Sequence, residues 1–138
     1  MSLRPILVAE DDDNDLTMLK MVFESCRVKN PLQVVNDGEE AIAYLAGEKP
    51  FDDRERFPLP ILFLLDLVMR RKGGLQVLEW LQARSKPSFP IVIFTGMRDL
   101  SQMRVAYQMG AHSFLMKPLV KRDFELLING FKEIEIEQ

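Results

Sequence analysis

The chain has 138 residues, of which 47% are hydrophobic and 28% are charged, and its formal net charge is -3. This length and composition predict one globular domain with a single core. The mild negative charge gives no reason to expect nucleic acid or an anionic membrane as a partner, and no apolar run approaches the roughly 20 residues that span a bilayer. With one cysteine, Cys26, and no signal-peptide pattern, we expect a cytoplasmic protein without disulfides.

In chain order, five short apolar segments predict strands, at 5–9, 32–35, 60–65, 90–94 and 113–116. Several are continuously apolar, as strands of a parallel sheet buried on both faces should be. Apolar residues at helical spacing follow each one. These stripes are Leu16, Leu19, Phe23 and Cys26; Ala41, Ile42 and Leu45; Leu75, Leu78 and Leu81; Met103, Ala106, Tyr107 and Gly110; and Phe124, Leu127, Ile128 and Phe131. The alternation predicts an α/β fold with helices on both faces of the sheet.

Two segments do not fit this alternation. Residues 47–60 form a long, proline-rich and charged connection, which predicts a surface excursion before the third strand. The last residues, 132–138, are expected either to finish the fifth helix or to fray. We therefore expect residues 1–138 to form a single domain, with no linker and no second domain.

The first strand runs directly into a group of carboxylates: Glu10, Asp11, Asp12, Asp13 and Asp15. Like charges this close stay ionised only if solvent, a helix end or a cation compensates them. Asp12 is well placed to cap the first helix, and Asp13 and Asp15 lie in its first turn, where the helix dipole favours negative charge. These three need no catalytic role. Glu10 and Asp11, at the strand end, are the pair that needs a cation.

Polar residues also end three of the other strands: Asp66 in "FLLDLV", Thr95 in "VIFTG" and Lys117 in "FLMKP". Taken alone, each is equally typical of a turn, a helix cap or a solvated side chain. In an open parallel sheet, however, sites form beyond the carboxyl ends of the strands. The topology therefore predicts that Glu10, Asp11 and these three residues meet at one edge, a set that capping alone does not explain.

The residue types indicate the chemistry of this set. Glu10, Asp11 and Asp66 form a cluster of hard oxygen ligands that suits Mg²⁺. An aspartate beside Mg²⁺ and a lysine can act as a nucleophile toward phosphorus and form an aspartyl phosphate. The metal and Lys117 would neutralise the phosphoryl oxygens, and the Thr95 hydroxyl can hydrogen-bond the transferred group.

At this point the chain resembles the receiver domains of response regulators in bacterial two-component signalling. The resemblance is carried by "ILVAEDD", "LLDLVM", the "GG" at 73–74, "VIFTG" and "GAHSFLMKP", and it extends from about residue 5 to residue 136. It implies a flavodoxin-like (βα)5 doubly wound sandwich, with a five-stranded parallel sheet in the order 2-1-3-4-5. It also implies that Asp66 accepts a phosphoryl group from the phosphohistidine of a sensor histidine kinase.

The resemblance assigns roles to further residues. It implies that Glu10 and Asp11, with the backbone carbonyl of Val68, hold Mg²⁺ beside Asp66. It implies that Thr95 is the switch hydroxyl, that Lys117 contacts the phosphoryl group, and that Phe114 is the switch aromatic residue. The Lys117–Pro118 peptide bond would be cis, as such bonds occur essentially only before proline.

Some positions depart from the pattern of the family. Arg70 stands where a proline is frequent, four residues after the phosphoacceptor. Val68 and Met97 occupy the two positions that usually modulate dephosphorylation, and neither can orient an attacking water molecule, so we expect a slowly lost phosphoryl group. The 47–60 segment is similar to that of a stand-alone subgroup often associated with bacterial phytochromes.

Two alternative functions compete with this interpretation. A degenerate receiver would act as a constitutive protein-binding module without taking up phosphate; the intact acidic, Thr and Lys set argues against it. A phosphatase of the haloacid dehalogenase type is suggested by the D-x-D-x-T match at 13–17. In that case Asp13 would be the nucleophile, but it falls on the helix rather than at the strand end, and the late acidic pair is missing.

As a receiver, the chain would be a signalling protein rather than an enzyme, since it would catalyse only its own phosphorylation and dephosphorylation. Its output would then pass to a partner protein, or to a homodimer formed through the fourth-helix, fifth-strand and fifth-helix face or through the C-terminal helix. The only histidine, His112, is expected to be a solvated loop residue, and Cys26 a packing residue.

Overall fold

The protein is described by a computed structural model that covers residues 3–84, 87–96 and 100–138. Strands and helices alternate along these residues. The strands are β1 (Ile6–Ala9), β2 (Leu32–Val35), β3 (Leu62–Leu65), β4 (Ile91–Thr95) and β5 (Ser113–Met116). The helices are α1 (Asp13–Ser25), α2 (Gly38–Ala46), α3 (Gly74–Gln82), α4 (Leu100–Gln108) and α5 (Lys121–Asn129). Within the described ranges, no helix has the length and apolar character needed to cross a membrane.

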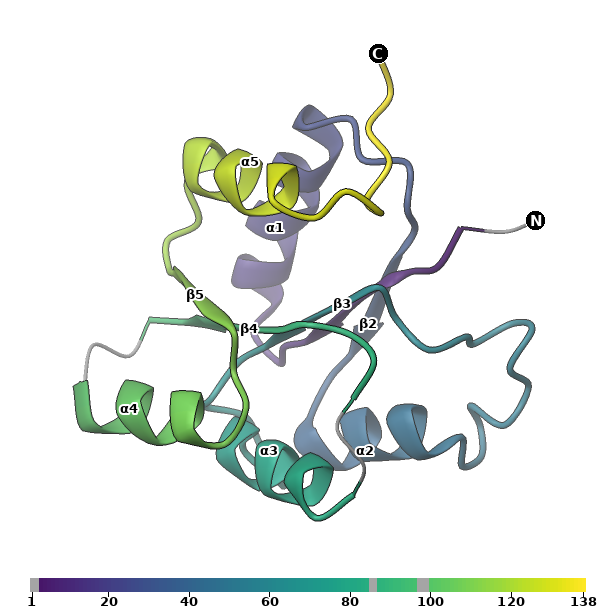
Figure 1. Cartoon of the computed structure of the whole chain (residues 1–138), viewed down its shortest axis with the longest axis vertical. Coiled ribbons are helices and arrows are strands. Elements are labelled where there is room, and N and C mark those ends of the chain that lie inside the picture. Colours follow the sequence, from purple (N-terminus) through teal and green to yellow (C-terminus); the bar gives the residue numbers. More distant parts are fainter. Residues whose placement is uncertain (1–2, 85–86, 97–99) are drawn as a thin grey trace.

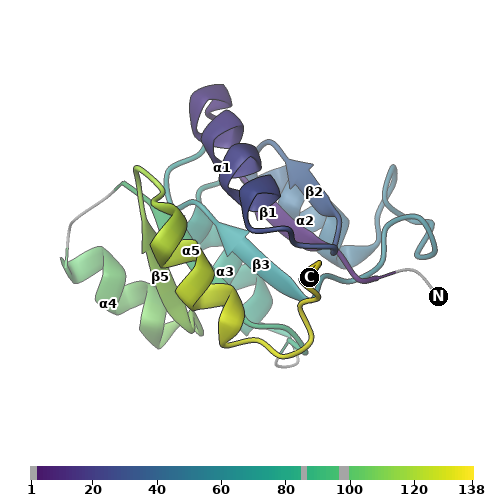
Figure 2. The ribbon, with the colours of Figure 1, turned by 90° about the horizontal axis from the view of Figure 1, so that it is seen from above.

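The strands form one parallel sheet in the order β2-β1-β3-β4-β5, which confirms the predicted topology. Helices α1 and α5 cover one face of the sheet, and α2, α3 and α4 cover the other (Figure 1). Seen from above, α1 and α5 run side by side (Figure 2), and the rings of Phe23 and Phe124 lie 6.0 Å apart between them. All the strands therefore end at the same edge, where parallel strands place a site.

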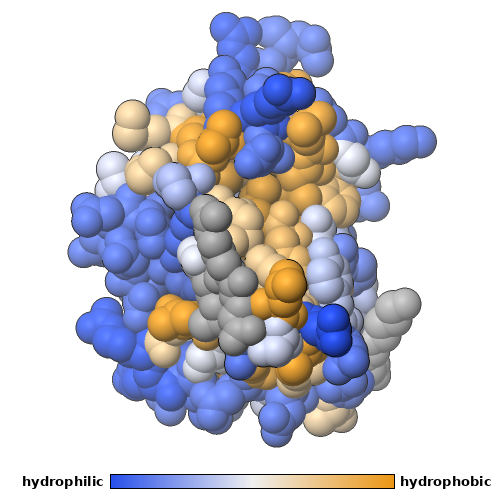
Figure 3. All heavy atoms as spheres, turned by 90° about the vertical axis from the view of Figure 1, so that its left-hand side faces the viewer, coloured by the Kyte–Doolittle hydropathy of each residue, from blue (hydrophilic) through white to orange (hydrophobic). Residues whose placement is uncertain are grey.

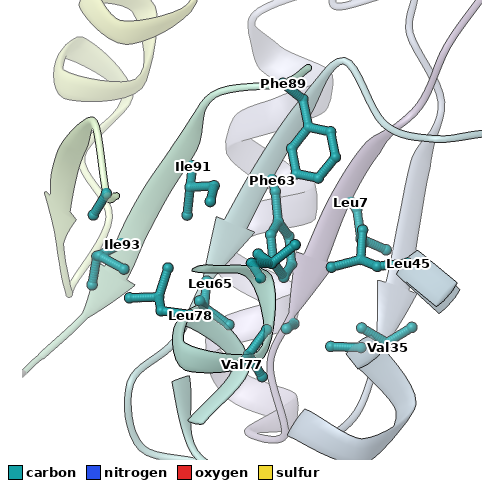
Figure 4. Packing of buried hydrophobic residues seen from close by; sticks show 14 of the residues in the cluster. Leu7, Val35, Leu45, Phe63, Leu65, Val77, Leu78, Phe89, Ile91 and Ile93 are labelled. Atoms are coloured by element: carbon teal, nitrogen blue, oxygen red, sulfur yellow. The ribbon is translucent and has the colours of Figure 1, made fainter. Parts of the chain in front are cut away.

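The continuous apolar runs of the central strands are explained by burial on both faces. Because successive side chains of a strand point to opposite faces, Leu62 and Leu64 of β3 pack toward α1 and α5, whereas Phe63 and Leu65 pack toward α2, α3 and α4. Figure 4 shows this second layer, in which Leu78 of α3 lies beside the sheet. The side chains of β3 are fully buried, so the residue that follows the strand is held in a fixed position.

Helix α1 begins with the predicted cap. The Asp12 carboxylate accepts a hydrogen bond from the Asp15 backbone N–H (2.9 Å), and α1 begins at Asp13. Asp37 caps α2 in the same way by accepting from the Glu40 N–H (2.8 Å). Cys26, just after α1, is buried, as expected for a packing residue.

The long segment 47–60 leaves α2 as a surface excursion, as predicted, but it is firmly attached to that helix (Figure 2). The rings of Phe51 and Phe57 lie 5.1 and 6.0 Å from the ring of Tyr44. The Arg54 guanidinium donates to the carbonyl oxygens of Tyr44 and Leu45, both at 2.8 Å. The last carbonyls of a helix run short of intrahelical donors, and the Tyr44 oxygen has only the Gly47 N–H (3.2 Å) besides, so Arg54 adds hydrogen bonds at this helix end.

The C-terminal residues contradict the expectation that they extend α5 or fray. Helix α5 ends at Asn129, and residue Ile136 forms an antiparallel bridge with Val28. The buried Asn30 side chain accepts a hydrogen bond from the Glu135 N–H (2.8 Å). The alternation of Ile and Glu in "EIEIE" is a strand pattern, and Ile134 is buried in the layer beneath α1 and α5.

The close approach of Gly74 to the strand end gives a test of this arrangement. A Cβ atom on Gly74 would lie 2.4 Å from the backbone oxygen of Asp66 and 2.8 Å from the Leu67 Cα. Both neighbours are backbone atoms, which cannot move aside without shifting the chain. We therefore expect Gly74→Ala to lower the free energy of unfolding by about 1–3 kcal/mol, measured by urea denaturation. The matched control is Gly96→Ala, whose Cβ would meet its nearest neighbour at 3.7 Å. Equal stability of the two variants would contradict the close packing.

Candidate functional site

The residues predicted to form a site do meet at the carboxyl edge of the sheet. Glu10 follows β1, Asp66 follows β3, Thr95 ends β4 and Lys117 follows β5. They line one open cavity of about 480 Å³. The other residues that line it are Asp11, Asp12, Asp15, Val68 and Gly96.

The acidic part of the cavity has the composition of a hard-cation site. Glu10 and Asp66 are 0% and 3% exposed, and each of them and Asp11 offers a carboxylate oxygen within 4.8 Å of the other two. Magnesium binds oxygen ligands at about 2.0–2.1 Å, so the ligands of one ion lie at most about 4.2 Å from one another, a spacing close to the one found here. These three residues therefore fit Mg²⁺, as predicted from their types.

Glu10 carries the strongest need for compensating charge. Its Oε2 accepts hydrogen bonds from the backbone N–H groups of Asp11 (3.0 Å) and Asp12 (3.1 Å). Its buried Oε1 lies 2.5 Å from Lys117 Nζ, but at angles poor for a hydrogen bond, so we treat the contact as an ion pair. Burial raises the pKa of Glu10 to about 7; Lys117 opposes this rise, and the negative charge of Asp66 adds to it. A cation near Glu10 would favour its ionised form.

Lys117 is the cationic centre of the site. Its Nζ donates to Asp66 Oδ2 at 2.8 Å and lies 2.8 Å from Asp15 Oδ2. It also lies 5.1 Å from the centre of the Phe94 ring. Burial by itself lowers the pKa of Lys117, but the contacts with Asp15, Asp66 and Glu10 outweigh it and raise the pKa well above the usual value. The ammonium group therefore stays charged at neutral pH.

Asp15 is the site residue that the sequence analysis missed. We predicted that it lies in the first turn of α1 and needs no catalytic role, and the structure adds a contact with Lys117 that this prediction did not include. One sequence signal was present: Asp15 follows Asp11 by only four residues, so the first turn of α1 begins beside the acidic pair. Asp12 caps α1 and Asp13 lies in its first turn, as predicted, and both are exposed.

The residues with a predicted switch role lie around β4 and β5. Thr95 is buried (1% exposed) and lines the cavity. The half-buried ring of Phe114 packs edge-on against Tyr107 of α4, with ring centres 4.8 Å apart. The Lys117–Pro118 bond is cis, as predicted. Met97 lies outside the described residues.

Arg70, where the family frequently has proline, reaches the metal-ligand set. Its backbone N–H donates to Asp11 Oδ2 (2.9 Å), and its Nε lies 3.5 Å from the same oxygen. The guanidinium is 78% exposed, so the ion pair can break without a large desolvation cost. An exposed cation therefore contacts the carboxylate group of Asp11, one of the three candidate metal ligands.

The alternative catalytic arrangements find no support in this geometry. Asp13, the nucleophile required by the haloacid dehalogenase pattern, is exposed on α1 and does not line the cavity. His112 is exposed, as predicted, but its ring Nδ1 accepts a hydrogen bond from the Ile91 N–H (3.0 Å), at the opposite end of β4. It is therefore far from the acidic cluster along the strand direction.

Comparison with known proteins agrees with this geometry. The response regulator receiver domain model matches residues 6–129. Response regulator Rcp1 of Synechocystis sp. is 26% identical over 133 residues, which cover 96% of this chain and 88% of Rcp1. The bacteriophytochrome response regulator RtBRR superposes with a TM-score of 0.83 at 32% identity, covering 94% of this chain and 78% of its own.

Two further solved structures are similar. The bacteriophytochrome response regulator AtBRR has a TM-score of 0.83 at 29% identity and covers 100% of this chain and 99% of its own. The Mn²⁺-bound form of Rcp1 has a TM-score of 0.78 at 23% identity, and the match covers 98% of this chain and 99% of its own. Since the family match runs from β1 to the end of α5, this chain belongs to the family of response regulator receiver domains, and it is related to the phytochrome response regulators.

Proposed function

We propose that the chain is a phosphorylatable receiver in which Asp66 accepts a phosphoryl group from the phosphohistidine of a sensor histidine kinase, in a Mg²⁺-dependent reaction. One observation carries the proposal. The Asp66 carboxylate shares a single open cavity with two further acidic residues, Glu10 and Asp11, and with a charged lysine, Lys117. This combination supplies a nucleophile, a cation site and a fixed positive charge in one place.

The reaction places these residues in defined roles. An oxygen of Asp66 attacks phosphorus, the P–N bond to the donor imidazole breaks as the P–O bond forms, and the imidazole nitrogen takes a proton from solvent. Lys117 offsets the charge on the phosphoryl oxygens. Bound Mg²⁺, held by Glu10, Asp11, Asp66 and the carbonyl of Val68, would neutralise more of that charge. The Val68 ligand rests on the family resemblance.

We further propose that phosphorylation acts through Thr95 and Phe114. The Thr95 hydroxyl would hydrogen-bond the phosphoryl group, and Phe114 would change its packing in response. In the structure Phe114 already contacts Tyr107, which is 50% exposed, so a change in its packing alters the surface of α4. To change the population of the active state from 1:99 to 99:1, phosphorylation must favour it by about 5.5 kcal/mol.

The surface formed by α4, β5 and α5 is the proposed output face. It carries apolar side chains over these elements (Figure 3), and a hollow lies between β5 and α5. Its exposed apolar residues include Leu100, Val105, Tyr107 and Leu126. Apolar surface that is exposed and contiguous is typical of protein–protein contacts. We propose a homodimer or a downstream protein as the occupant of this face.

The partner kinase can be proposed from the relatives. RtBRR and AtBRR are named bacteriophytochrome response regulators. We propose a phytochrome-like sensor kinase as the phosphodonor and a cytoplasmic location. A degenerate receiver that binds partners without phosphate is the competing function.

The first test is intact-mass measurement after incubation with Mg²⁺ and acetyl phosphate. We expect the parent protein to gain one phosphoryl group, because Asp66 is the nucleophile at the cavity. Asp66→Asn and a parent sample in EDTA are the controls, and both should stay unmodified. An unmodified parent, with Mg²⁺ binding confirmed by calorimetry, would favour the degenerate receiver.

Arg70 should weaken metal binding. Because its side chain contacts the Asp11 oxygen that would bind Mg²⁺, we expect Arg70→Ala to raise the Mg²⁺ association constant about two- to fivefold, the range for a partly exposed ion pair. Isothermal titration calorimetry at constant ionic strength measures the change. Lys72→Ala removes the same charge from the same loop, so an equal gain in that variant would show a general field effect and not competition for Asp11.

The phosphoryl group should be lost slowly. Val68 is 59% exposed and lines the cavity, so its side chain lies where an attacking water molecule would approach, and it cannot orient that water. We expect Val68→Asn, alone and with Met97→Asn, to speed the loss of the phosphoryl group, followed by mass spectrometry after removal of the donor. Val68→Ala tests whether the size of the Val68 side chain, rather than its lack of a polar group, slows the loss of the phosphoryl group. Unchanged decay in the double variant would contradict the prediction.

A further inference from the structure

The ammonium group of Lys117 is shared among three carboxylates. Its Nζ lies 2.5 Å from Glu10 Oε1, 2.8 Å from Asp15 Oδ2 and 2.8 Å from Asp66 Oδ2. These three oxygens crowd the ammonium, although the Glu10 contact is an ion pair and not a hydrogen bond. A phosphoryl group on Asp66 would add new oxygen acceptors beside it. Those oxygens would compete with the present carboxylate partners for the charge and the N–H groups of Lys117.

The contact with Asp15 is the easiest of the three to release. The Asp15 side chain is 27% exposed, against 0% for Glu10 and 5% for Asp66. A carboxylate that loses a buried cation pays a large desolvation penalty, whereas one at the surface is rehydrated by water. Asp15 also lies in the first turn of α1, where the helix dipole favours its negative charge after Lys117 has left.

We propose that Asp15 is a positioning residue that holds Lys117 in the unphosphorylated protein and competes with the phosphoryl group for its ammonium. Asp15 thereby lowers the stability of the phosphorylated form. This inference rests on the proposed function of Asp66 as phosphoacceptor. It assigns Asp15 a role beyond helix initiation, since its carboxylate would set how readily Lys117 is available to the transferred group.

Asp13 provides a matched control for this role. It lies in the same first turn of α1, carries the same charge and is exposed. If negative charge at the helix start were the whole function of Asp15, Asp13→Asn and Asp15→Asn would have equal effects. If the contact with Lys117 matters, only Asp15→Asn changes the response to a phosphoryl-like anion, and Asp15→Glu, which keeps the carboxylate, restores the parental behaviour.

The first measurement tests the contact itself without any ligand. Urea unfolding in EDTA is compared for the parent, Asp15→Asn, Lys117→Met and the double variant. We expect Asp15→Asn to raise the unfolding equilibrium constant when Lys117 is present. In the Lys117→Met background, the same substitution should raise it by about two- to fivefold less. Equal effects in the two backgrounds would show that Asp15 does not hold Lys117, and would overturn the inference.

The second measurement uses beryllium trifluoride, an anion that mimics a phosphoryl group, at saturating Mg²⁺. Binding followed by ¹⁹F NMR should tighten about two- to fivefold in Asp15→Asn, and remain parental in Asp13→Asn and Asp15→Glu. Unchanged or weaker binding in Asp15→Asn, or equal tightening in Asp13→Asn, would overturn the inference. If the parent protein does not bind the anion, the proposed function itself is overturned. That result can be told apart from a failure of the Asp15 inference alone, which the urea unfolding experiment detects separately.

Discussion

The whole site depends on one electrostatic constraint: folding gathers three carboxylates around a single ammonium, with a fourth, Asp11, in the same cavity. Parallel strands bring Glu10, Asp66 and Lys117 to the same edge, and the first turn of α1 adds Asp15. Because such like charges repel at low solvent exposure, the fold must compensate them. Lys117 and two backbone N–H groups do so in part, but burial still raises the pKa of Glu10, and the charge of Asp66 adds to the rise. A bound divalent cation would supply the remaining compensation.

The fold can hold these charges close together because the sheet directly beneath the site is rigid. The central strands are buried on both faces, so Asp66, the proposed phosphoacceptor that follows β3, is held in a fixed position. Gly74 brings the start of α3 against the Asp66 backbone, and the Asp37 carboxylate, 2.8 Å from Arg71 Nε, ties the same loop to α2. Chemistry that requires positioning to within tenths of an ångström is thus supported by core packing rather than by the exposed loops themselves.

Much of this arrangement could be predicted from the sequence, for a specific reason. Apolar runs locate strands, and in a parallel sheet the residues that end the strands must meet, so Asp66, Thr95 and Lys117 could be brought together without coordinates. Contacts between the side chains of distant segments could not be predicted in this way. The reach of Asp15 to Lys117 depends on how α1 packs beside β5. Asn30 meets the C-terminal segment across 105 positions of the chain, which no local periodicity encodes.

Strand β5 connects the chemistry to the surface. Lys117 follows its last residue, and Phe114 lies within it and packs against Tyr107 of α4. A ligand shifts an equilibrium only by its differential affinity for the two states. A phosphoryl group would meet that condition in the proposed mechanism, because it would exchange partners with Lys117 at one end of this short strand, while Phe114 would change its packing at the other. The apolar face over α4, β5 and α5 (Figure 3) would then change shape without any residue of that face touching the phosphoryl group.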